Sequence, residues 1–187
     1  IIPCSINKFE KNEYIKKLIL NYIGASMWNK FYKSSFYKQT NILSIEGIGQ
    51  GEDYAVVPRI LYHTDKIVWL DKHLYNYNLT NQNSYSNNIS KYSIMSLKKA
   101  DDIVYDFFKD KSEYSDVIDL IYLRSMLFLI KTSCKECYND IISIYSNVKL
   151  VRLDRRVSLS DKLIIFLIRM RWFEMCAYLI KIVRSNI

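Results

Sequence analysis

The 187-residue sequence contains only four glycines and two prolines. Both residues punctuate turn-rich all-β folds, so their scarcity favours helices. No run of about eighteen uncharged apolar residues occurs, and no transmembrane span is predicted. The start carries no secretory signal, so we expect a cytoplasmic, reducing environment in which the cysteines at 4, 134, 137 and 176 stay free.

Half of the residues are hydrophobic, enough for the core of one domain with or without an appendage. The net charge of +8 favours anionic partners, but the basic residues are scattered, so nucleic acid is not the expected partner. Cys134-Lys-Glu-Cys137 lacks a second cysteine pair and lies far from both histidines. We interpret it as two free thiols on a helix, and no metal site is predicted.

The apolar spacing predicts an α+β fold that is dominated by helices. Asn12 is the expected cap of a first short helix that ends at Gly24, and a second helix begins at Glu52 and contains Pro58. Asp101 and Asp102 are interpreted as a solvated pair. Further helices are predicted at 91–110, 115–135, 137–147 and 160–184, short strands at 42–45, 67–70 and 74–77, and a polar loop at 78–88.

The helix predicted at 160–184 is amphipathic. Its basic residues fall on the other half of the helix, and two interpretations follow. The favoured one is a helix packed on the core with a solvated basic face; the alternative is peripheral attachment to the inner face of an anionic membrane. The apolar face comprises Ile164, Ile168, Trp172, Met175, Leu179 and Ile182.

Two local patterns carry the functional argument. The first is Trp28-Asn29-Lys30, and the second is a glycine-bearing loop that ends in Gly51-Glu52-Asp53. In order and spacing these patterns, with the aromatic segments at 67–77, resemble the acceptor-side half of bacterial family 2 glycosyltransferases over residues 23–85. That resemblance implies a partial GT-A fold, with 1–88 as the C-terminal part of the GT-A domain and 89–187 as a helical extension.

The resemblance also implies roles for individual residues. Asp53 would be the general base on the acceptor hydroxyl, with Glu52 orienting the loop or capping the helix. Trp28, Asn29 and Lys30 would border the donor and acceptor sites, and Gly51 would let a sugar approach closely. Plainer interpretations stay open: an acidic first helical turn for Glu52 and Asp53, a core anchor for Trp28, which we favour slightly, and a surface charge for Lys30.

The sequence departs from the family pattern in its nucleotide-binding residues. It contains no Asp-x-Asp, so the ligands of the divalent Mg or Mn ion that the resemblance implies are absent, and Asn78-Leu79-Thr80-Asn81 replaces an arginine-containing loop. We therefore expect the 187 residues alone to be inactive. In the complete enzyme we expect inverting transfer from a nucleotide-sugar donor to a glycan or lipid-linked acceptor in surface polysaccharide synthesis. The alternative is a non-catalytic, basic helical module that binds protein or nucleic acid.

Overall fold

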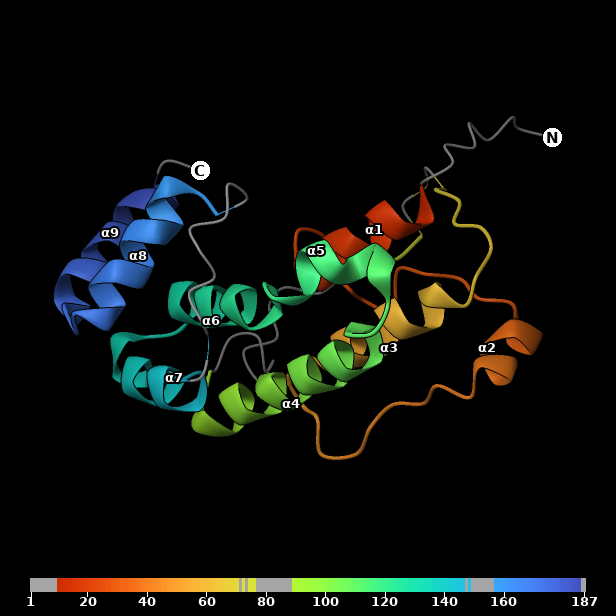
Figure 1. The fold of residues 1–187 in the computed structure, drawn as a ribbon, viewed down its shortest axis with the longest axis horizontal. Coiled ribbons are helices and arrows are strands. Elements are labelled where there is room, and N and C mark those ends of the chain that lie inside the picture. The colour runs from red at the N-terminus through yellow and green to blue at the C-terminus, as the bar shows by residue number, and fades with distance from the viewer. Residues whose placement is uncertain are drawn as a thin grey trace.

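The computed structural model describes residues 10–70, 72, 74–76, 89–146, 148 and 157–185, and helices dominate these segments (Figure 1). Two short 3₁₀ turns, η1 (Ser112–Tyr114) and η2 (Lys135–Cys137), connect neighbouring helices. The α-helices are α1 (Lys11–Ile19), α2 (Ser34–Thr40), α3 (Glu52–Tyr62), α4 (Lys91–Phe108), α5 (Ser115–Ile118), α6 (Ile121–Thr132), α7 (Tyr138–Ile144), α8 (Leu159–Arg169) and α9 (Phe173–Ser185).

The long helix α4 lies at the centre of the core, where it packs against α3, α6 and α7, while α1 packs on α3. The Ser90 side chain caps α4 by accepting a hydrogen bond from the backbone N–H of Ser93. The Ser93 hydroxyl in turn accepts one from the backbone N–H of Ser90. Val104 and Phe108 on the inner face of α4 are fully buried. The Phe108 ring meets the ring of Tyr114 edge to face at 4.7 Å, which ties α4 to the turn before α5.

The predicted halves 1–88 and 89–187 contribute to one hydrophobic core. Leu18 of α1 and Val57 of α3 belong to the same buried cluster as Ile94 of α4 and Leu129 of α6. Each side chain of this kind stabilises the fold by about 1.5–3 kcal/mol when it is fully withdrawn from water. The two halves therefore depend on each other for burial.

The strand predictions were wrong for the described residues. Residues 42–45 and 74–76 form no strand, and within 67–70 only Val68 forms an isolated bridge. Ile42 packs instead on Val56 and Ile60 of α3, so a helix face rather than a neighbouring strand covers it. Tyr77 and the predicted loop 78–88 lie outside the described residues. The fold is helix-dominated as predicted, and the partial GT-A architecture stays a prediction.

Several helix boundaries also differ from prediction. The cap of α1 is Glu10, whose carboxylate accepts the backbone N–H of Glu13, and α1 ends before Gly24. Asn12 instead accepts a hydrogen bond from the Tyr114 hydroxyl at 2.9 Å. The helix predicted to begin at Glu52 is confirmed as α3, which runs through Pro58, whereas the short helix α2 was not predicted.

The predicted helix 160–184 is divided into α8 and α9 by a turn in which Arg171 has a φ of 55°. The turn interrupts the helical repeat, so the side chains of α9 do not continue the faces of α8. As a result Ile164 and Ile168 are buried as predicted, whereas Trp172 and Met175 are exposed, and Cys176 takes an inward position. The prediction of one continuous apolar face was wrong because it assumed an unbroken helix.

Asp101 and Asp102 differ sharply in environment, so the prediction of a solvated pair was wrong. Asp101 is fully buried, and its carboxylate accepts hydrogen bonds from the Ser125 hydroxyl at 2.6 Å and the Tyr145 hydroxyl at 2.8 Å. Burial raises the pKa of Asp101 to about 8. Asp102 is half-exposed and pairs with Lys98 at 2.6 Å.

Candidate functional site

The loop before α3 is fastened to α4 by one serine. The Ser96 hydroxyl accepts the backbone N–H groups of Gly49 and Gln50, both at 2.9 Å, and donates to the Gln50 carbonyl at 3.0 Å. A single buried hydroxyl thus satisfies three polar groups of an irregular segment. Sequence reasoning missed Ser96, because a serine within a helix is not distinctive by itself.

Gly51 is the N-cap residue of α3 and lies directly against α4. Its φ is 87°, and a Cβ atom there would lie 2.9 Å from Leu97 Cδ1 and 3.1 Å from Ala100 Cβ. Both observations require glycine. The predicted substrate-binding residue therefore has its Cα turned toward the core, where it allows the first turn of α3 to approach α4 closely.

Asp53 connects the first turn of α3 to the 26–30 segment. Its Oδ2 atom accepts a hydrogen bond from the backbone N–H of Met27 at 3.0 Å. Within the described residues its Oδ1 atom accepts none. This bond brings together the two sequence patterns, Trp28-Asn29-Lys30 and Glu52-Asp53, which are separated by more than twenty residues of chain.

Lys30 lies close to the Asp53 carboxylate. Its ammonium donates to the Ser26 carbonyl at 2.7 Å and to Asn29 Oδ1 at 2.8 Å. Partial burial lowers the pKa of Lys30 to about 8, although the negative charge of Asp53 opposes the shift. Lys30 is therefore a partly buried cation held by hydrogen bonds, rather than a plain surface charge.

Trp28 and Glu52 are exposed neighbours of the segment that carries Lys30 and of Asp53. Trp28 is 44 % exposed, so its favoured interpretation as a core anchor was wrong. Its ring stacks on that of Tyr75, with centroids 4.6 Å apart and an interplanar angle of 26°. Glu52 is exposed at the start of α3, and its pKa is raised by loss of hydration and, to a smaller degree, by the charge of Asp53.

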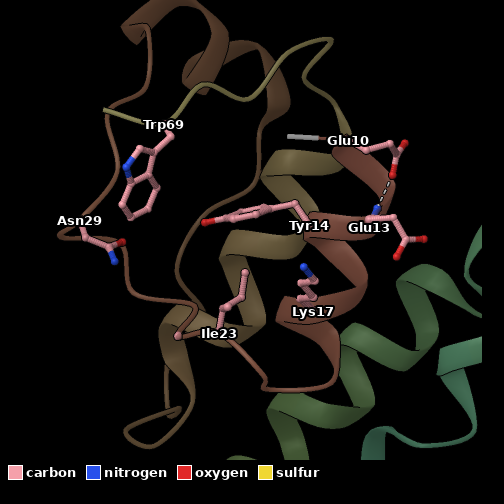
Figure 2. Close-up of a pocket in the computed structure, with 8 residues that line it drawn as sticks. Glu10, Glu13, Tyr14, Lys17, Ile23, Asn29 and Trp69 are labelled. Atoms are coloured by element: carbon pink, nitrogen blue, oxygen red, sulfur yellow. Dashed lines mark hydrogen bonds between the residues drawn. The ribbon is translucent and has the colours of Figure 1, made fainter. Parts of the chain in front are cut away.

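A hollow of about 530 Å³ lies beside the same segment (Figure 2). Tyr14 projects from α1 toward the loop that carries Asn29 and the segment that carries Trp69. Asn29 is the one predicted site residue in the lining, and Asp53 is not part of it. The hollow is lined by Glu10, Glu13, Tyr14, Lys17, Ile23, Gly24, Asn29 and Trp69.

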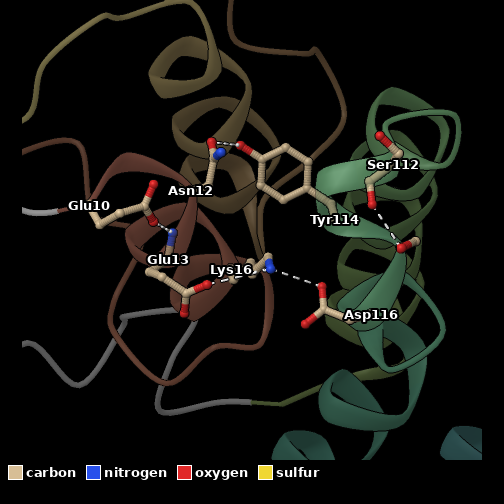
Figure 3. Close-up of polar contacts among 8 residues, drawn as sticks. Glu10, Asn12, Glu13, Lys16, Ser112, Tyr114 and Asp116 are labelled. Carbon is tan, nitrogen blue, oxygen red and sulfur yellow. Dashed lines mark hydrogen bonds and ion pairs between the residues drawn. The ribbon is translucent and has the colours of Figure 1, made fainter.

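The α1 wall of the hollow is fixed by polar contacts with the η1–α5 region (Figure 3). The Tyr114 hydroxyl donates to Asn12, and Lys16 forms ion pairs with Asp116 at 3.1 Å and with Glu13 at 3.5 Å. These contacts hold the helix that presents Tyr14. Sequence reasoning missed Tyr14 and Trp69 as lining residues, since their positions in an apolar stripe and a predicted strand indicated packing alone.

The described residues offer no ligand set for the divalent metal ion that the resemblance implies, because they bring no three His, Cys, Asp or Glu side chains together. The Cys134 and Cys137 thiols lie 3.6 Å apart. Cys134 precedes the 3₁₀ turn η2 and Cys137 ends it, so the prediction that both lie on a helix was wrong. Among the described helices, none is long and apolar enough to cross a bilayer.

Comparison with protein-family models, with curated proteins and with solved structures found no match.

Proposed function

We propose that this chain is the acceptor-side part of an inverting glycosyltransferase of the family 2 type, in which Asp53 is the general base. The single observation that carries the proposal is the hydrogen bond from the Met27 backbone N–H to Asp53 Oδ2. It joins the two patterns on which the sequence resemblance rests at one place in the fold. In this proposal the nucleotide-sugar donor and its metal ion bind residues other than those described.

The bond also leaves Asp53 suited to proton transfer. One carboxylate oxygen is held by Met27, which fixes the orientation of the group, while the other can face an acceptor hydroxyl. Removal of the hydroxyl proton as the new glycosidic bond forms contributes about 10²–10⁴-fold to the rate. The acceptor oxygen then attacks the anomeric carbon directly, so a single displacement inverts its configuration.

Aromatic and polar groups on neighbouring segments supply surfaces for a sugar, although Asp53 does not line the hollow. The exposed edge of the Trp28–Tyr75 stack and the hollow lined by Tyr14, Asn29 and Trp69 present ring faces beside amide and carboxylate groups. Ring faces pack on the apolar C–H faces of hexoses, and polar groups bond their hydroxyls. Lys30 places a cation close to the base, where a diphosphate or a developing negative charge would be stabilised.

The alternative is a non-catalytic module in which Asp53 only fastens the 26–30 segment. The two proposals differ in what an isosteric change does. In Asp53→Asn the side-chain carbonyl can still accept the Met27 N–H, so the loop stays in place, whereas the base is lost. The full-length protein carrying Asp53→Asn should lose about 10²–10⁴-fold in sugar transfer to an acceptor, with unchanged affinity for the nucleotide sugar.

The matched control is Asp65→Asn, which changes an exposed carboxylate just after α3. Turnover should be measured with labelled nucleotide sugars, together with the thermal unfolding of each variant. Equal turnover of Asp53→Asn and the parent protein would remove Asp53 from its role as base. Equal loss in both variants would point to a general effect of charge.

A further inference from the structure

The hairpin of α8 and α9 is apolar on two opposite sides. Its inner side is buried: Ile164 and Ile168 of α8 and Cys176 of α9 face the core, where α8 packs on α6 and α9 packs on η2. The Phe173 ring meets the Tyr138 ring edge to face at 5.7 Å, which anchors the start of α9. The hairpin lies at the end of the molecule opposite α2 (Figure 1).

The outer side of α8 carries a second apolar stripe. Leu159, Leu163, Phe166 and Met170 follow one another at spacings of four, three and four residues, which places them on one helix face. All four are exposed, from 45 % for Leu163 to 84 % for Leu159. A helix that is apolar on both sides is normally covered on both sides, so this stripe indicates an interaction surface.

The stripe continues onto α9 across the turn. The rings of Phe166 and Trp172 meet edge to face with centroids 6.1 Å apart, and Met175 is exposed one turn further along. The outer surface therefore joins both helices and includes two aromatic rings. We call these six residues, Leu159, Leu163, Phe166, Met170, Trp172 and Met175, the outer face of the hairpin.

The charges of the hairpin are sorted by side. Lys162 and Arg169 lie seven residues apart on α8, along a row directly next to the apolar stripe, and Arg171 lies in the turn. Both acidic residues of the hairpin pair with basic residues outside it. Asp161 is buried and paired with Lys131 and Arg124, and Glu174 pairs with Lys135.

We infer that the outer face of α8–α9 is a docking surface for an anionic lipid bilayer. Leucine, phenylalanine and tryptophan side chains insert at the boundary between headgroups and acyl chains, and flanking lysines and arginines attract the phosphates. The charge pattern selects this occupant over a second copy of the chain. Two hairpins packed face to face would bring their Lys162 and Arg169 rows together, and both acidic residues between 159 and 185 are already paired with other basic residues.

This inference does not depend on the proposed sugar transfer, because it rests on residues far from Asp53. It describes a helix hairpin that lies in the plane of the membrane surface. The contact between the Phe166 and Trp172 rings shows that the exposed apolar residues of α8 and α9 adjoin across the turn at Arg171. The hairpin thus presents exposed apolar side chains with basic residues next to them.

The test is sedimentation of the 187-residue chain with lipid vesicles. One set of vesicles contains phosphatidylcholine alone, and the other contains phosphatidylcholine with phosphatidylglycerol. We expect the protein to sediment with the anionic vesicles, to do so less as salt is raised, and to stay largely unbound with the neutral ones. The fluorescence of Trp172 should be quenched by brominated acyl chains, and Trp172→Phe should remove that quenched component.

Two pairs of substitutions separate the apolar and basic contributions. Leu163→Gln with Phe166→Gln should weaken partitioning by about tenfold or more, since both side chains lose the burial that insertion provides. Lys162→Gln with Arg169→Gln should weaken binding to anionic vesicles by about fivefold per residue. Matched controls on the other end of the molecule are Phe31→Gln and Lys33→Gln with Lys38→Gln, all of them exposed positions that should leave partitioning unchanged.

Other outcomes would overturn the inference. Partitioning by the hairpin variants equal to that of the parent would exclude the outer face as the docking surface, and absence of binding to anionic vesicles would exclude the membrane. A dimer in sedimentation velocity that Phe166→Gln abolishes, together with absence of vesicle binding, would assign the face to a second copy. Asp53→Asn should bind vesicles like the parent, so a failure of this inference is distinguishable from a failure of the proposed function.

Discussion

The region around Asp53 and the α8–α9 hairpin are stabilised in opposite ways. Around Asp53 the backbone is largely irregular, and single polar contacts hold it: Met27 N–H to Asp53, and Ser96 to the loop before Gly51. The hairpin has regular helices that attach through their apolar inner side, with Ile164 completely buried. In the irregular segments, stability depends on individual hydrogen bonds. In the packed helices, it depends on the apolar area that they bury.

Asp101 is fully buried in α4, and its titration should affect the stability of the whole fold. Its pKa is about 8 in the folded protein and near 3.8 in the unfolded chain, so the folded state binds the extra proton between these values. Stability should therefore be highest at the acidic end of that range and should fall as the pH rises through about 8. We expect a loss on the order of a few kcal/mol, measured by urea unfolding over this pH range.

Asp101→Asn should flatten this pH dependence, because the amide does not titrate. Asp102→Asn, which changes the neighbouring half-exposed carboxylate, should leave it in place. A pH dependence that persists in Asp101→Asn would show that other groups cause it.

Within the hairpin, neighbouring residues should differ strongly in their contribution to stability. Ile164→Ala removes a fully buried side chain and should lower the free energy of unfolding by about 3 kcal/mol. Leu163→Ala changes the adjacent residue of the same helix, which faces outward, and should cost about 1 kcal/mol or less. Chemical denaturation measures both. Equal losses would contradict the assignment of an inner and an outer side.

A side chain at Gly51 should lower the stability of the fold more than a side chain at Gly24. Gly51→Ala would force a Cβ atom against Leu97 at a φ of 87°, and we expect a loss of about 2 kcal/mol from strain and overpacking. Gly24→Ala is the matched control, since among the described residues a Cβ there meets Ser26 Oγ alone, at 3.6 Å. Thermal unfolding of the two variants should separate them clearly, and equal melting temperatures would contradict the close approach of α3 to α4.

Parts of the fold were predictable because local signals agreed. The helix at 52–63 follows a glycine and begins with two acidic residues, and the α4 segment has a serine cap and a regular apolar spacing. The short strands were wrong because an apolar run such as 42–45 can be covered either by another strand or, as here for Ile42, by a helix. Periodicity alone does not separate the two.

Only part of the neighbourhood of Asp53 was predictable from the sequence, and the roles of its residues stay predictions. Asp53, Trp28 and Lys30 were chosen by resemblance, and the fold brings them close together. The exposure of Trp28 and the packing role of Gly51 depend on Tyr75 and Leu97, which lie far away in the sequence. Ser96 and Tyr14 carried no local signal that marks them as part of this region.

The sequence by itself determined that the chain is mainly helical, that it is basic, and which segments carry apolar stripes, since these properties depend on composition and on spacing of three to four residues. Only the tertiary structure decided which stripe is buried, that Asp101 is enclosed, and that Met27 meets Asp53. The physical reason is that burial and hydrogen bonding between distant segments depend on which surfaces pack together. A turn such as that at Arg171 redirects a whole helix face without altering the local pattern.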